Sequence, residues 1–122
     1  MKKDIETRAD IELLVRSFYD KVREDAIIGY IFTDIAKVNW EKHLPVMFDF
    51  WENLLFYTGG YEGNPVAIHQ QLNQVVPLEP SHFKQWNLLF KETVLENFEG
   101  NNAVLALQRA ISIATVIQIK LM

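Results

Sequence analysis

Two histidines of this chain, His69 and His43, have both the side chain and the setting to do chemistry. His69 lies in the polar stretch NPVAIHQQLN, just after TGGYEGN, and no acid stands beside it to make it a general base. His43 lies on an apolar helical face, and neutral imidazole is a metal ligand that titrates near neutral pH. The ordinary alternatives are an incidental histidine in a solvated loop for His69 and a core or rim histidine for His43. The third histidine, His82, is interpreted as an exposed or rim residue at a predicted helix start.

The elements that must position these residues are helices, because nearly every long segment has a helical period and nothing alternates like a strand. The segment between residues 61 and 80 is predicted to be mostly irregular, with Pro65 starting a single helical turn. So long an irregular stretch is uncommon in a compact domain unless it is functional or disordered. The predicted helices run from a cap at Asp10 to about Ile28, from Lys37 to Tyr57, from Pro80 to the Gly100 signal, and from a cap at Asn101 or Asn102 to the carboxyl end. The last helix carries the apolar residues Val104, Leu107, Ile111, Ala114, Ile117 and Leu121.

The second predicted helix has two apolar stripes where a surface helix needs one. One side can meet the other helices, and the other side needs an apolar group that this short chain does not supply. Tyr19 on the first helix and Trp86 on the third also present polar-tipped rings inward. With His43 they predict an apolar pocket with a few convergent polar groups. The two stripes are Trp40, His43, Met47, Phe50 and Leu54, and Leu44, Phe48, Trp51 and Leu55.

Composition limits the class of protein. The 122 residues, 49% of them hydrophobic, predict one domain over residues 1–122 with one core. The absence of cysteine excludes disulfides, thiolate metal sites and cysteine nucleophiles, and fits a reducing compartment. The net charge of −4 argues against nucleic acid. No apolar run follows MKKDIETRAD, and AISIATVIQI is too short to span a bilayer, so we expect a cytoplasmic protein without a membrane partner.

Several segments, in order and at suitable spacing, resemble the truncated haemoglobins, and most closely group III of that family. They cover most of residues 11–117 and read FYDKVREDAIIGYIF, WEKHLPVMFDFWENLLF, GNPVAIHQQL, PLEPSHFKQWNLLF and LQRAISIA. The resemblance implies a globin-like two-over-two helical sandwich around haem b (iron protoporphyrin IX), with His69 as the iron ligand. It places Tyr19, His43 and Trp86 on the distal, ligand-binding side. It also implies haem contacts from Phe32, Met47, Phe50, Trp51 and Phe83.

The function that the resemblance implies is binding of dioxygen, nitric oxide or carbon monoxide at the iron, with slow release through hydrogen bonds from Tyr19 and Trp86. Because no acid neighbours His69, we expect its second ring nitrogen to bond a backbone carbonyl or water. Pro45 breaks a helical hydrogen bond, so we expect His43 in the first turn of its helix, where it can swing between pocket and solvent.

Three alternatives remain at this point. The same haem could support nitric oxide or peroxide detoxification, as a nitric oxide dioxygenase or a peroxidase-like enzyme. Turnover of nitric oxide would then need an unidentified reductase, because the chain has no flavin or nicotinamide motif. A cofactor-free helical interaction module is an alternative from another class. A non-haem metal bundle would need inward-facing carboxylates with Glu-x-x-His pairs, and the helices offer none.

Overall fold

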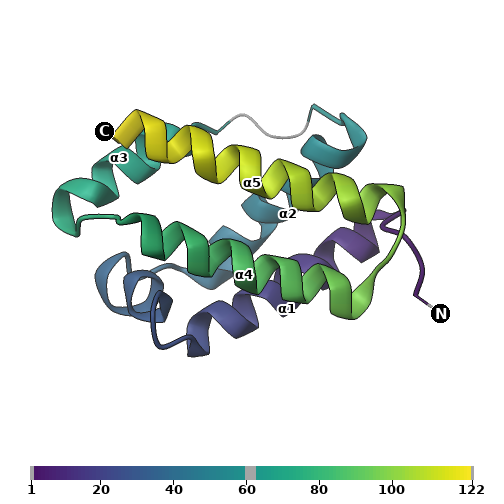
Figure 1. Ribbon diagram of the computed structural model, residues 1–122, viewed down its shortest axis with the longest axis horizontal. Coiled ribbons are helices and arrows are strands. Elements are labelled where there is room, and N and C mark those ends of the chain that lie inside the picture. Colours follow the sequence, from purple (N-terminus) through teal and green to yellow (C-terminus); the bar gives the residue numbers. More distant parts are fainter. Residues whose placement is uncertain (1, 60–62, 122) are drawn as a thin grey trace.

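The computed structural model describes residues 2–59 and 63–121, which form helices joined by short connections. Their bounds are α1 Arg8–Glu24, a single π-helical turn Ile31–Ile35, α2 Trp40–Phe56, α3 Pro65–Val75, α4 Pro80–Asn97 and α5 Asn101–Leu121. α1 and α2 make one layer and α4 and α5 the other, and across the layers α1 packs on α4 and α2 on α5 (Figure 1). The predicted all-α two-over-two arrangement is therefore confirmed.

α1 begins one turn earlier and ends earlier than the sequence predicted. Its cap is Thr7, whose hydroxyl accepts the N–H of Asp10 at 3.2 Å, while the Asp10 carboxylate accepts the N–H of Thr7 at 3.0 Å. Asp10 is thus the reciprocal partner in a capping box, and its assignment as the cap was wrong. The helix stops at Glu24. The Asp25 carboxylate accepts the backbone N–H groups of Ile27 and Ile28, and this turns the chain out of the helix.

α2 is buried on two sides, as its two apolar stripes predicted. The stripe Leu44, Phe48, Trp51 and Leu55 is buried in the core. The stripe Trp40, His43, Met47, Phe50 and Leu54 is half-buried throughout. The helix begins at Trp40, so His43 is its fourth residue and lies in the first turn, as expected.

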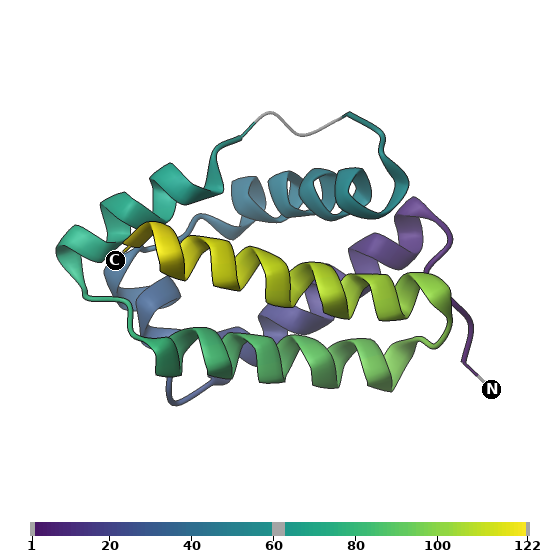
Figure 2. The same ribbon diagram turned by 45° about the horizontal axis from the view of Figure 1, so that its top comes forward.

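α5 buries only two of the apolar residues named from its sequence, Ala114 and Ile117, and otherwise a face of alanines. Its buried residues are Ala103, Ala106, Ala110, Ala114 and Ile117, whereas Val104 and Ile111 are 53% and 58% exposed. Small side chains let α4 and α5 approach closely, and a helix that is apolar over most of its circumference does not reveal which stripe its neighbour selects. By length and composition alone α5 could cross a membrane, with a mean hydropathy of 1.5. In this fold it lies against α4, α2 and α3 (Figure 2).

The start of α5 is capped from a distant part of the chain. The Asp4 carboxylate accepts the N–H groups of Asn102 at 3.0 Å and Ala103 at 2.9 Å. The prediction that Asn101 or Asn102 provides the cap was wrong, because the amino-terminal segment brings a carboxylate to the helix end, where it also meets the positive end of the helix dipole.

α3 corrects the prediction of a single helical turn, since it is an 11-residue helix. The Asn64 side chain accepts the N–H of Ala67 at 3.1 Å, and Pro65 occupies a first-turn position. α3 buries none of its side chains and packs beside the carboxyl-terminal end of α5 (Figure 2). The sequence signal was missed because α3 has no buried stripe of its own.

Candidate ligand-binding site

His69 lies on α3, and only one of its ring nitrogens has a hydrogen-bond partner among the described residues. Its Nδ1 atom lies 2.6 Å from the backbone carbonyl oxygen of Pro65. Because a carbonyl can only accept, Nδ1 carries a proton, and in the neutral imidazole Nε2 is then the nitrogen with the lone pair. The prediction that a backbone carbonyl bonds the second nitrogen is confirmed. The bond fixes both the tautomer and the ring orientation, which is how proteins prepare a histidine to bind a metal.

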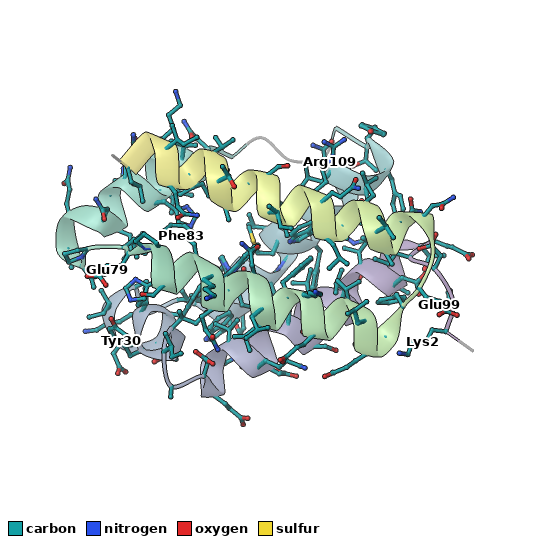
Figure 3. All side chains as sticks on the ribbon, in the orientation of Figure 1. Lys2, Tyr30, Glu79, Phe83, Glu99 and Arg109 are labelled. Atoms are coloured by element: carbon teal, nitrogen blue, oxygen red, sulfur yellow. The ribbon has the colours of Figure 1, made fainter. Side chains whose placement is uncertain are left out.

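An apolar cavity of about 270 Å³ lies between α2, α3 and α5. Val66 contributes to its wall from α3, one helical turn before His69. Phe83, in the first turn of α4, lies toward α3 (Figure 3) and is buried in a cluster that includes Val66 and Ile117. An apolar group between α2 and α3 would therefore cover surfaces that the chain leaves half-exposed. The full lining is Phe50, Leu54, Pro65, Val66, Arg109, Ser112, Ile113, Val116 and Ile117.

The other predicted site residues gather at the start of α2 and the middle of α1. The ring of Tyr19 lies edge-on to His43 at 5.3 Å and contacts Phe32 at 6.0 Å. Phe18 contacts Tyr19 at 4.9 Å and Trp86 at 5.3 Å, so Trp86 joins this group through Phe18. The structure therefore brings these residues together from α1, α2, α4 and the π-helical turn.

The apolar residues assigned to the second helix divide between two environments. Met47 and Phe50 are half-buried against the edge of the core. Trp51 is only 2% exposed and stacks on Phe90 at 4.6 Å, with Phe50 edge-on at 5.6 Å. Trp51 therefore faces the core and supports Phe50 from behind, whereas Phe50 lines the cavity.

Three polar atoms in this region have no partner within the described ranges. His43 Nε2 is buried without a hydrogen bond, and the Tyr19 hydroxyl and Trp86 indole N–H make none. Burial lowers the pKa of His43, which favours neutral imidazole, and raises the pKa of Tyr19, which keeps its hydroxyl protonated. A buried polar atom without a partner costs about 1–3 kcal/mol, so a polar guest here would recover that free energy.

Two residues near the site were missed by sequence reasoning. Trp40 contacts Tyr19 at 5.3 Å and His43 at 5.7 Å, and its place three residues before His43 on one stripe was the available signal. Arg109, on α5 beside the end of α2 (Figure 3), borders the cavity with its Nε atom buried and unpaired. Nothing in LQRAISIA indicated that position.

His82 is explained by the start of α4. Its Nδ1 atom accepts the N–H of Glu79 at 3.0 Å, in a reciprocal capping arrangement. The Glu79-x-x-His82 spacing therefore belongs to a helix cap. In the part of the chain that the structure describes, no group of three or more His, Cys, Asp or Glu side chains could hold a metal ion.

Comparison with known proteins agrees with this geometry. The chain is 32% identical to a group 3 truncated hemoglobin from Campylobacter jejuni, over an alignment of 123 positions that covers 97% of this chain and 93% of the relative. The chain belongs to the group 3 truncated haemoglobins. A crystal structure of the group III truncated hemoglobin from the same organism matches this truncated haemoglobin with a TM-score of 0.86 and 30% identity, covering 100% of this chain and 96% of that one. No family model matches the chain.

Membership in this family makes the protein a globin-type haem protein that binds small gaseous ligands. The residues present fit a haem: a histidine with a free Nε2, an apolar cavity beside it, and unpaired polar atoms on the neighbouring helices. The family assignment decides against the cofactor-free interaction module.

Proposed function

We propose that this truncated haemoglobin binds haem b through Nε2 of His69 and uses it to bind dioxygen and other diatomic ligands, which it releases slowly. Haem iron supplies reversible binding of diatomic molecules. The observation that carries the proposal is the buried Nε2 atom of His43, which has no partner among the described residues. The Tyr19 hydroxyl and the Trp86 indole N–H lie in the same region and also make no hydrogen bond with the described residues. Such groups are costly in an apolar pocket unless a ligand uses them.

The haem would be held by apolar contacts from several elements. Phe32, whose ring contacts Tyr19, and Met47, one helical turn after His43, would pack on it together with Phe50, which the buried Trp51 supports. Phe83 would hold the opposite side through the cluster that joins α3, α4 and α5. His69 itself is oriented by the Pro65 carbonyl, so its ring does not need a carboxylate partner.

Slow release follows from what the distal groups can donate. Trp86 can only donate through its indole N–H, and Tyr19 remains a donor because burial raises its pKa. A hydrogen bond to a partly charged ligand contributes about 1.5–3 kcal/mol, which corresponds to roughly a 10- to 150-fold slower escape per bond. The proposed protein is therefore suited to retaining oxygen and poorly suited to shuttling it.

The test begins with the axial assignment. We expect the purified protein to show an intense Soret band, and resonance Raman spectra to show an iron–histidine stretch that His69→Ala abolishes. His82→Ala is the matched control, because that histidine caps α4 and should leave the stretch intact. In stopped-flow experiments oxygen release should be slow in the wild type and fast in Tyr19→Phe/Trp86→Phe. A colourless protein that fails to take up hemin, or fast release in the wild type, contradicts the proposal.

His43 supports a second candidate function, oxidative detoxification of nitric oxide or peroxide. Its buried Nε2 is unpaired, and burial lowers its pKa, so a neutral imidazole is available to accept a proton. This activity would need an external reductase for nitric oxide. Consumption of nitric oxide or peroxide, measured with a supplied reductant in wild type and His43→Leu, decides between the two: a binder shows no turnover in either.

A further inference from the structure

The first turn of α2, which carries His43, is weakly stabilised by its own residues. The Asn39 cap makes no side-chain hydrogen bond, and Lys37 just before it adopts a φ of 49°. Pro45 has no N–H, so the carbonyl of Glu41 lacks its usual helical partner. Contacts from elsewhere in the fold must therefore hold this turn in place.

Those contacts converge on Trp40, the first residue of the helix. Its ring stacks on Phe32 at 6.3 Å with an interplanar angle of 24°, and it lies edge-on to His43 at 5.7 Å. It also contacts Tyr19 at 5.3 Å. Its neighbour from the last turn of α1 is Arg23, whose guanidinium carbon lies 4.5 Å from the centre of the ring. That distance is typical of a cation–π contact.

We propose that Arg23 and Trp40 form a latch that holds the first turn of α2 on α1 and keeps the His43 ring against Tyr19, so that opening of the latch controls ligand entry. The link to ligand entry rests on the proposed function, whereas the latch itself is a set of contacts within the chain. Arg23 and Trp40 act here as positioning residues. Trp40 contacts the His43 ring, Arg23 contacts Trp40 from α1, and neither needs contact with the ligand.

The geometry explains why a latch is needed. His43 Nε2 forms no hydrogen bond with the described residues, and the ring contacts of His43 are with Tyr19 and Trp40. Its own helix turn lacks a cap and one hydrogen bond, so opening that turn breaks few local interactions. The Arg23 contact therefore adds, from α1, a support that this turn does not provide for itself. Arg23 is also paired with Asp20 at 3.5 Å, on the exposed side of α1.

The test measures carbon monoxide association by flash photolysis in the haem-loaded protein. Arg23→Gln should associate roughly two- to fivefold faster, the factor expected for loss of a partly exposed cation–π contact. Trp40→Leu should change the rate at least as much. In a His43→Ala background Arg23→Gln should have no further effect, because the residue that the latch positions is gone.

Two controls separate the latch from general loosening of α1. Arg16→Gln removes another α1 guanidinium, which lies 5.0 Å from the Phe48 ring and away from His43. Asp20→Asn removes the ion pair of Arg23 and leaves the ring contact. Both should leave the association rate unchanged. Equal acceleration by Arg16→Gln, or an Arg23→Gln effect that persists without His43, overturns the proposal.

The second measurement can be made with or without bound haem. The His43 ring protons lie in the ring currents of Tyr19 and Trp40, so their NMR shifts should move toward those of an exposed imidazole in Arg23→Gln and not in Arg16→Gln. The shifts are measured in the carbon monoxide complex, or in the protein as purified if it carries no haem. Absence of haem would defeat the proposed function and leave this result decisive for the latch. Unchanged shifts in Arg23→Gln would refute the latch.

Discussion

Replacing Tyr19 by phenylalanine should accelerate ligand release, and it should leave the stability of the haem-free protein unchanged or raise it. The side chain is 5% exposed, and its hydroxyl makes no hydrogen bond within the described residues. The haem-free protein therefore gains no hydrogen bond from this hydroxyl among the described residues. A hydroxyl that gives the fold no hydrogen bond but can donate one to a bound ligand is typical of a functional site.

The magnitudes follow from the two states of the hydroxyl. With ligand bound, loss of one charge-assisted donor should accelerate oxygen release roughly 10- to 150-fold, the equivalent of about 1.5–3 kcal/mol. Without haem, Tyr19→Phe should leave the free energy of unfolding unchanged or raise it by up to about 1–3 kcal/mol. Because burial raises the pKa of Tyr19, its contribution should not vary with pH in the neutral range.

The assay pairs stopped-flow oxygen release from the ferrous protein with urea unfolding after haem extraction. Tyr30→Phe is the matched control, since that ring is 40% exposed and contributes to no described contact of the site. The reasoning is refuted if Tyr19→Phe destabilises the haem-free protein by more than about 1 kcal/mol while release stays as slow as in the wild type. That outcome would mean that the hydroxyl serves the fold.

Further predictions concern the framework and pH. Asp4→Ala should lower the free energy of unfolding by about 1–2 kcal/mol in urea titrations, because it removes the cap of α5. Burial opposes ionisation of Asp4, but backbone N–H groups outweigh it and lower its pKa. Its contribution should therefore be present above about pH 4 and be lost as pH falls through the depressed folded value. Gly29→Ala should destabilise by about 1–3 kcal/mol, since an added Cβ would lie 2.8 Å from the carbonyl oxygen of Val22. Burial lowers the pKa of His43 in the folded state, so the unfolded chain binds more protons below about pH 6.5. Stability should fall as the pH drops below that value, and His43→Leu should flatten this part of the profile.

The sequence predicted much of the site because the relevant signals were local. The two stripes of α2, and the carbonyl bonded to His69, follow from helical spacing and from the absence of a neighbouring acid. The convergence of Tyr19 with His43 was also predicted, and their rings do meet. Trp40 was predicted only as a residue of an apolar stripe. Its contact with Arg23 joins two segments, and the spacing of residues along the sequence cannot show that these segments come together.

By itself, the sequence determined that the chain is helical, that α2 needs apolar partners on both sides, and that His69 has no acid beside it. These properties depend on residue type and on a 3.6-residue period, so they can be read within a few turns of chain. Only the tertiary structure decided that alanines line the buried face of α5, that Asp4 caps it, and that α3 is a full helix lying on α5. Each of these depends on which distant surface comes close, because an apolar helix offers several faces and a helix end accepts any suitable acceptor.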